Sequence, residues 1–227
     1  MATAPQILDS WLTSKNYTKG RDGPFEPDTL VIHVMEGTEA AAESWFNHEP
    51  SDVSANYGAR KDSVIERYVR ETDTAWAQGR VYKPTAKQVL QRPNVNPNSY
   101  CISIECEGSG KEPLTPVQKT SVVWLINDIR SRWPKILLDR DHIIGHHEIF
   151  AQKTCPGVIN VTELVQLAKG ITLPVGAPPR MVYSPSIGDW LVVTRYVSDD
   201  EWYFYPMNEL TRGTRAGTAL SKMPLTP

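Results

Sequence analysis

Short apolar runs, separated by turns rich in Gly, Pro, Asn and Asp, predict a series of strands along the chain. Residues 29–34 (Thr-Leu-Val-Ile-His-Val) form an apolar and β-branched run that is typical of a buried strand. Residues 54–60 and 64–69 flank a Lys-Asp-Ser turn and predict a hairpin. Residues 100–105 alternate between apolar and polar positions, and residues 141–145 predict a last short strand.

Three helices are predicted between and after these strands, at 38–47, 116–133 and 161–168. The longest of them has apolar residues at steps of four, three and four, which draws one apolar stripe along the helix. The residues of this stripe are Val122, Ile126, Ile129 and Trp133. The polar residues placed to cap the three first turns are Thr38, Thr115 and Asn160.

The mixed order of strands and helices predicts an α/β fold, in which a central mixed, mostly β sheet is flanked by helices. The composition changes after residue 170. Residues 171–180 are rich in Pro and Gly and predict a semi-rigid linker. Residues 181–227 begin with aromatic and β-branched runs separated by turns, which predict a small all-β module. The main domain is therefore expected to span residues 1–170.

The charge balance gives no reason to expect an anionic partner. The 227 residues include 24 basic and 26 acidic side chains, for a formal net charge of -2. Neither nucleic acid nor an anionic membrane surface is indicated by this balance. No apolar run approaches the roughly 18 residues of a membrane span. The first residues lack the basic and apolar regions of a signal peptide, so we expect a soluble protein made in a cytoplasm.

The three cysteines do not suggest a disulfide scaffold. Cys101 and Cys106 lie five residues apart in one predicted strand. An odd offset in a strand directs two side chains to opposite faces, so these thiols are not expected to bond to each other.

Residues 145–157 (Gly-His-His-Glu-Ile-Phe-Ala-Gln-Lys-Thr-Cys-Pro-Gly) concentrate chemically active side chains in one short stretch. Zinc favours imidazole and thiolate ligands, and a catalytic zinc takes three protein ligands and leaves one position for water. A histidine and Cys155 from this stretch can supply two ligands. His33, within the predicted strand at 29–34, is the candidate for the third.

Five motifs, in the right order, resemble those of the type 2 N-acetylmuramoyl-L-alanine amidases, which include phage endolysins, bacterial cell-wall amidases and peptidoglycan recognition proteins. The resemblance covers roughly residues 25–168. The motifs are Val-Ile-His at 31–33, Asp-Thr-Ala-Trp at 73–76, Ile-Ser-Ile-Glu at 102–105, Gly-His at 145–146 and Lys-Thr-Cys-Pro-Gly at 153–157.

The resemblance implies a zinc amidase fold with a central sheet, and it implies His33, His146 and Cys155 as zinc ligands. By the Gly-His pattern the second ligand is His146, nine residues before Cys155. Many phage members separate the two by eight residues, which would favour His147. We prefer His146 and place the extra residue in the loop that follows Glu148.

The resemblance also implies two catalytic residues. Glu105 stands where the glutamate-dependent members carry their general base, and Glu107, two residues on, is the competitor on the same face of the strand. Lys153 stands where the family has a catalytic or oxyanion-stabilising lysine.

Two departures from the family affect the substrate cleft. Some phage members place a catalytic tyrosine where this chain has Ala55, and Tyr57, two residues on, is expected to line the cleft without replacing it. The family often has Thr-Ala-Trp-His-Ala-Gly, whereas Trp76 is followed here by Ala-Gln-Gly at 77–79. A pocket histidine is therefore missing. We expect Tyr57 and Trp76 to contact the substrate.

The function implied is hydrolysis of the amide between N-acetylmuramic acid and L-alanine in peptidoglycan, with zinc as cofactor. A phage endolysin, held in the host bacterial cytoplasm until it is released to the cell wall, is the favoured setting. A non-catalytic peptidoglycan-binding protein and a cytosolic amidase that recycles anhydro-muropeptides are the alternatives. The C-terminal module is a candidate for cell-wall binding, with equal weight given to a role in completing the surface of the enzyme or in a dimer contact.

Overall fold

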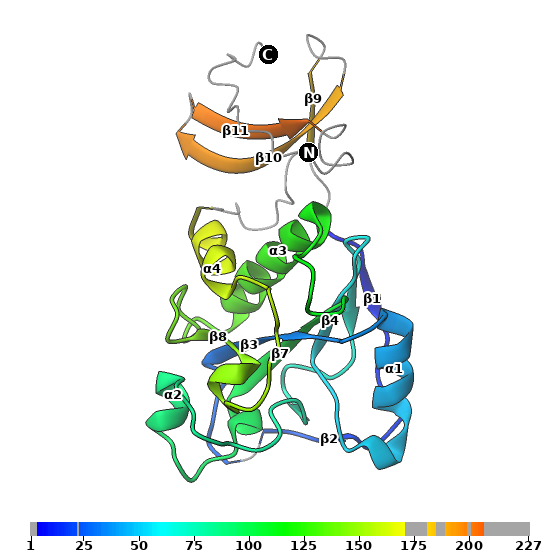
Figure 1. Cartoon of the computed structure of the whole chain (residues 1–227), viewed down its shortest axis with the longest axis vertical. Helices are drawn as coiled ribbons and strands as arrows, with labels where there is room; N and C mark the ends of the chain where they lie inside the picture. The colour runs from blue at the N-terminus through cyan, green and yellow to red at the C-terminus, as the bar shows by residue number, and fades with distance from the viewer. Residues whose placement is uncertain (1–3, 22, 171–180, 185–188, 199–200, 207–227) are drawn as a thin grey trace.

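A computed structural model of the chain describes residues 4–21 and 23–170, and further on the backbone of three strands (Figure 1). These strands are β9 (Met181–Ser184), β10 (Asp189–Ser198) and β11 (Glu201–Pro206), which pair antiparallel in the order β11-β10-β9. The predicted linker at 171–180 and the chain after residue 206 lie outside the described residues. The division of the chain into two domains stays a prediction.

A six-stranded mixed sheet forms the centre of residues 4–170, with the strand order β1-β5-β4-β7-β3-β8. Strands β4 and β5 pair antiparallel as the predicted hairpin, and the other neighbours pair parallel. The strands are β1 (Ile7–Asp9), β3 (Thr29–Val34), β4 (Tyr57–Ala59), β5 (Ile65–Arg67), β7 (Cys101–Cys106) and β8 (Ile143–Gly145). The predicted class, a mixed sheet flanked by helices, is confirmed.

Helices α3 and α4 cover one face of this sheet, while α2 and a small two-stranded sheet of β2 and β6 lie beyond its other face (Figure 1). The helices are α1 (Glu39–Asn47), α2 (Lys87–Leu90), α3 (Pro116–Arg132) and α4 (Val161–Gly170). The short elements are β2 (Tyr17–Thr18), β6 (Thr74–Ala75) and the 3-10 turns η1 (Glu49–Ser51), η2 (Pro97–Ser99) and η3 (His146–Glu148).

The start of α3 is fixed by local chemistry, as the sequence predicts. The Thr115 hydroxyl accepts from the Gln118 backbone amide at 3.2 Å, and the Gln118 side chain accepts from the Thr115 amide at 3.3 Å. This capping box satisfies two backbone donors that the first turn leaves free. The helix then buries Val122, Ile126 and Ile129 against the sheet.

The strands of the central sheet present different faces to two separate apolar clusters. On β3, Leu30, Ile32 and Val34 belong to the cluster under α3 and α4, while Val31 packs on the opposite side. Because side chains alternate along a strand, His33 shares the face of Val31 and points away from α3 and α4. The two ends of β7 follow the same rule: Cys101 and Cys106 lie in different clusters, and both are free thiols as expected.

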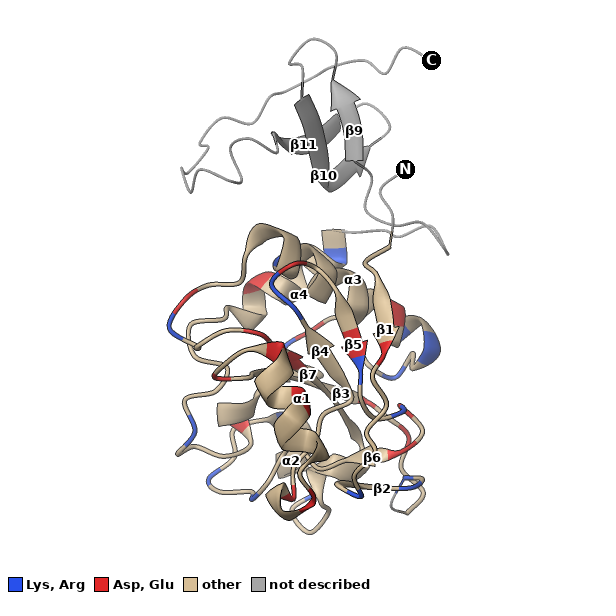
Figure 2. Ribbon diagram, turned by 90° about the vertical axis from the view of Figure 1, so that its right-hand side faces the viewer, with Lys and Arg blue, Asp and Glu red and all other residues tan. Residues whose placement is uncertain are grey.

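Acidic and basic residues are interspersed over the ribbon of residues 4–170 (Figure 2). None of the helices that the structure describes has the length and apolar character needed to cross a membrane.

The contact between α3 and the sheet predicts a large loss of stability for Ile126→Ala. Ile126 is fully buried in the cluster under the two helices, so its truncation leaves a cavity. We expect the free energy of unfolding to fall by about 2–5 kcal/mol. Urea denaturation measures it. Val117→Ala on the same helix, where the side chain is 38% exposed, should change it by less than about 0.5 kcal/mol. Equal effects of the two variants would contradict this packing.

Candidate metal centre

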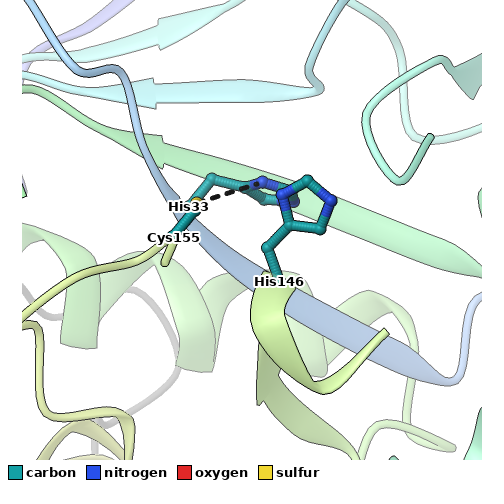
Figure 3. A group of neighbouring side chains, drawn as sticks. All are labelled: His33, His146 and Cys155. Carbon is teal, nitrogen blue, oxygen red and sulfur yellow. Dashed lines mark hydrogen bonds between the residues drawn. The ribbon is translucent and has the colours of Figure 1, made fainter. Parts of the chain in front are cut away.

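Three buried side chains from distant parts of the chain meet at the carboxyl ends of the parallel strands. They are His33 near the end of β3, His146 at the start of η3 and Cys155 in the loop that follows (Figure 3). One potential ligand atom from each lies within 4.8 Å of the others. We call these three residues the donor group.

The pairing of β3 with β8 brings the two histidines together. Ile32 pairs with Gly145 in parallel register, so His33, the next residue of β3, lies close to His146, which directly follows β8. Their ring centroids lie 4.5 Å apart. The two histidines are therefore close in space although they are far apart in the sequence, because the pairing of β3 with β8 sets the distance between them.

Cys155 is held against β3 by its own sulfur. The Val34 backbone amide donates to Cys155 Sγ at 3.3 Å, and His147 donates its backbone amide to the Cys155 carbonyl at 2.9 Å. A Cβ at Gly145 would lie 2.8 Å from Pro156 Cδ, so a glycine is required where the loop passes β8. The loop is thus packed onto the sheet at both strands.

The donor group fits a zinc ion by ligand type and by spacing. Two imidazoles and a thiolate are ligands that zinc favours. Cys155 Sγ and His33 Nδ1 are 3.7 Å apart, along the dashed line in Figure 3. Two ligands at ordinary zinc distances and a tetrahedral angle are separated by about 3.6 Å. The described residues could therefore hold a metal ion here.

Burial keeps the donors uncharged. It lowers the pKa of His33 well below its usual value; the neighbouring His146 and Lys153 act in the same direction, and the Gln78 side chain opposes them. Burial also lowers the pKa of His146, and it raises the pKa of the Cys155 thiol to about 12. Neutral imidazoles are ready to bind a cation, whereas the thiol must release its proton when it does.

Glu105 lies beside the donor group because β7 pairs with β3 so that Glu105 is opposite His33. Its Oε1 is 3.6 Å from His33 Nδ1, and its Oε2 is buried without a hydrogen-bond partner. Burial and then repulsion by Glu36 raise the pKa of Glu105 to about 8, while Lys153 opposes the rise. A carboxyl group with such a pKa can take up or release a proton near neutral pH.

Lys153 lies at the exposed rim of the same site. Its positive charge lowers the pKa values of His33, His146, Glu105 and Cys155. The Lys153 ammonium is therefore close enough to the site to influence all four groups electrostatically.

Two alternatives from the sequence are placed outside the donor group. His147 is exposed, and its Nδ1 lies 3.1 Å from the Cys155 carbonyl, so the structure brings His146 and not His147 into the group. The Glu107 carboxylate accepts from the backbone amides of Glu39 at 3.3 Å and Lys61 at 2.8 Å. The Glu107 side chain therefore stabilises the backbone of two neighbouring segments, at Glu39 and at Lys61.

The structure corrects the expectation that Tyr57 lines the cleft of the donor group. Strand β4 pairs with β7 so that Gly58 lies beside Glu105 and Tyr57 lies beside Ile104, on the face covered by α3. The Tyr57 hydroxyl donates to Glu71 Oε1 at 2.6 Å, at the edge of a separate cavity of about 300 Å³. Tyr57 and His33 thus lie on opposite faces of the sheet.

Trp76 is half-buried, and its indole Nε1 donates to the Thr18 hydroxyl at 3.0 Å. The predicted contact of Trp76 with substrate stays a prediction. The remaining histidines lie elsewhere: His142 contacts Asp139 and Gln88, and His48 stacks on Trp45.

Gln78 is the residue of this site that the sequence analysis did not select. Its backbone carbonyl lies 3.2 Å from His146 Nε2, and its side chain is 1% exposed and faces His33. The departure from the family motif at 77–79 was the signal that could have drawn attention to it.

The position of Tyr57 leads to a pH-dependent prediction for Glu71. Burial raises the pKa of Glu71, but hydrogen bonds from Arg132, Tyr57 and Trp133, together with the charge of Arg132, outweigh burial and leave the pKa below its usual value. A lowered pKa means that the ionised form stabilises the folded state, and that this stability is lost as the pH falls through the folded pKa.

We therefore expect Glu71→Gln to reduce the free energy of unfolding at pH 7 by about 1–3 kcal/mol. The difference from the unmodified protein should shrink as the pH is lowered from about 5 to about 3. Urea denaturation across this range is the measurement. Glu112→Gln removes an exposed partner of Lys61 and should change little. A Glu71→Gln deficit that stays constant down to pH 3 would exclude a contribution from the ionised carboxylate.

The sequence model of a family described as N-acetylmuramoyl-L-alanine amidase matches residues 23–158 of the chain. N-acetylmuramoyl-L-alanine amidase A of Achromobacter lyticus is 34% identical over 97 residues, which are 42% of this chain and 44% of that protein. The 1,6-anhydro-N-acetylmuramyl-L-alanine amidase AmpD of Haemophilus influenzae (strain ATCC 51907 / DSM 11121 / KW20 / Rd) is 35% identical over 97 residues, 43% of this chain and 47% of that protein.

The chain thus spans less than half the length of these two relatives. Among solved structures, the Ph2119 endolysin of a Thermus scotoductus MAT2119 bacteriophage has a TM-score of 0.51 and 15% identity. That alignment covers 72% of this chain and 99% of the endolysin, and it shows a shared fold.

Proposed function

The chain belongs to the N-acetylmuramoyl-L-alanine amidase family, and from this premise we propose that it is a zinc enzyme that hydrolyses the amide between N-acetylmuramic acid and L-alanine in peptidoglycan. The observation that carries the proposal is the buried donor group with an ionisable carboxyl group, Glu105, at 3.6 Å from one donor. A metal-dependent hydrolase needs both features in one place, since water must be activated by the metal ion and its proton removed by a base.

His33, His146 and Cys155 would hold the zinc ion. A zinc ion bound there would act as a Lewis acid on the carbonyl and would lower the pKa of water. The three donors come from two strand ends and one packed loop, so little rearrangement is needed for them to converge. Their convergence, together with Glu105 and Lys153, argues against a protein that only binds peptidoglycan.

Glu105 is the proposed general base, and Lys153 the proposed stabiliser of negative charge. The buried Glu105 carboxylate would take a proton from the attacking water and later deliver it to the leaving amine. The Lys153 ammonium, at the exposed rim, would face the oxygen on which negative charge develops. Trp76 remains a candidate for contact with the substrate, whereas Tyr57 is withdrawn from that role.

The proposed setting is that of a phage endolysin acting on the cell wall. The fold shared with the Ph2119 endolysin supports this setting, while the relative named AmpD supports the alternative of an enzyme that acts on anhydro-muropeptides. The two settings differ in substrate. An endolysin must cut the intact polymer, and a recycling amidase acts on small soluble fragments.

The proposed reaction is tested by digesting purified cell walls with the full chain. We expect new L-alanine amino termini without new reducing sugar ends, because only the amide between sugar and peptide is cut. A parallel assay on soluble anhydro-muropeptides distinguishes the two settings. An increase in reducing ends, or no cleavage of either substrate by the zinc-loaded protein, would overturn the proposal.

The donor group predicts how single substitutions change zinc content. His146→Ala and Cys155→Ser should each lose bound zinc, because alanine offers no ligand and a hydroxyl is a far poorer ligand than a thiolate. His147→Ala is the matched control and should keep most of the metal, since His147 is exposed and outside the group. Metal analysis after gel filtration is the measurement, and loss of zinc from His147→Ala but not from His146→Ala would move the ligand by one residue.

The role of Glu105 is tested by Glu105→Gln. The amide is nearly isosteric with the carboxyl group but cannot take the proton, so the rate of wall hydrolysis should fall by about 100-fold to 10,000-fold while zinc is retained. Tyr57→Phe is the control on the far face of the sheet and should have a small effect on rate. A near-normal rate for Glu105→Gln beside an inactive Tyr57→Phe would remove Glu105 from the reaction.

A further inference from the structure

Gln78 touches both histidines of the donor group without being a donor itself. Its backbone carbonyl lies 3.2 Å from His146 Nε2, and its side chain, which is buried, faces the ring of His33. One residue thus contacts the first imidazole through its main chain and the second through its side chain.

Two of the atoms between Gln78 and His33 are unpartnered and complementary. Within the described part of the chain, four buried side-chain nitrogen or oxygen atoms have no hydrogen-bond partner. His33 Nε2 and Gln78 Oε1 are two of them. Buried polar atoms without partners are uncommon in folded proteins. An imidazole N–H donates and an amide oxygen accepts, so the two atoms are complementary as donor and acceptor.

The orientation of each ring decides which nitrogen is free for a metal ion. A neutral imidazole carries one N–H, and the other nitrogen has the lone pair that binds metal. A carbonyl can only accept, so His146 Nε2 must carry its hydrogen toward Gln78 and leave Nδ1 free. In His33, Nδ1 is the atom that faces Cys155 Sγ at 3.7 Å and Glu105 Oε1 at 3.6 Å. For Nδ1 to offer its lone pair to a metal ion among these groups, the hydrogen of the neutral ring must be on Nε2, toward Gln78.

We infer that Gln78 is a positioning residue that holds both His33 and His146 as the Nε2–H tautomer, with Nδ1 of each free for the metal ion. The inference rests on the proposed zinc function. Groups that receive the second N–H of a ligand histidine fix its orientation and raise its affinity for the metal. Here one residue serves two ligands, so its loss should affect both.

The backbone at Gln78 is itself held in place by a side chain from a different loop. Asn98 Oδ1 accepts from the backbone amides of Ala77 at 3.1 Å and Gln78 at 2.9 Å. Asn98 lies in η2, just before β7, and its own amide donates to Asn96 Oδ1 at 3.0 Å. These hydrogen bonds hold the backbone that directs the Gln78 carbonyl toward His146.

The test uses Gln78→Met in the full chain, because methionine has a similar length and lacks the acceptor oxygen. Zinc affinity is measured by competition with a chelating dye, and the tautomers of the metal-free protein by the ¹⁵N chemical shifts of the imidazole nitrogens. We expect zinc affinity to fall by about 10-fold to 100-fold, and His33 to become a mixture of tautomers. Gln78→Glu keeps an acceptor at this place and should retain the Nε2–H form.

Gln88→Met is the matched control. Gln88 is also a buried glutamine whose side chain contacts a histidine, but that partner is His142, outside the donor group. This variant should bind zinc as the unmodified protein does. If Gln78→Met does not fold, Gln78→Asn replaces it, since the shorter side chain withdraws its oxygen from His33.

The inference is overturned if Gln78→Met binds zinc with unchanged affinity and His33 stays fully in the Nε2–H form. An unmodified protein that binds no zinc would instead overturn the proposed function. In that case the tautomers of the metal-free protein still decide the role of Gln78, because they are measured without metal.

Discussion

The parallel pairing of β3 with β7 and β8 is the constraint on which the rest of the site depends. It places Glu105 opposite His33 and brings His146 to the same edge. The register is set by the apolar residues that alternate with His33, since Leu30, Ile32 and Val34 must face α3 and α4. A slip by one residue would turn His33 into that core. The apolar cluster under α3 and α4 thus determines where the two histidines lie, although neither histidine belongs to that cluster.

Burial, rather than any one ion pair, sets the charge state of the site. The imidazoles are kept neutral, the thiol is kept protonated, and Glu105 holds its proton to a higher pH than an exposed carboxyl group would. All of these effects arise because charged groups lose the solvation of water. A divalent cation bound there would favour the deprotonated forms of Cys155 and Glu105, since its charge stabilises both the thiolate and the carboxylate. The donor group is therefore suited to a cation by its solvation as well as by its spacing.

The sequence predicted the elements that carry a long or local signal. The strand with His33, the strand with Glu105 and α3 have clear periodicity or capping residues, and the structure contains them close to their predicted bounds. The strands β1, β2 and β6, of two or three residues each, are too short to show a period. The helix α2 lies in a Pro- and Asn-rich stretch that predicts irregular structure.

The contacts between side chains around the site were harder to predict than the three residues of the donor group. Tyr57 was misplaced because the face of a residue in a three-residue strand depends on the register with its partner, here Gly58 beside Glu105. Gln78 was missed because its contact with His146 joins two loops 68 residues apart. Sequence motifs indicate which residues form a site, but they carry little information about which neighbouring side chains orient those residues.

The separation of the two faces of the sheet determines which side chains could transfer a proton in the proposed reaction. Tyr57 is committed to Glu71 and Arg132 under α3, and burial raises the pKa of its hydroxyl far above the physiological range, so it can neither reach the donor group nor ionise. Glu107 is occupied by two backbone amides. Of the carboxyl and phenol groups proposed from the sequence, Glu105 is then the one that lies beside a donor and has a pKa, about 8, within reach of neutral pH. These contacts favour Glu105 as the general base in the proposed hydrolysis.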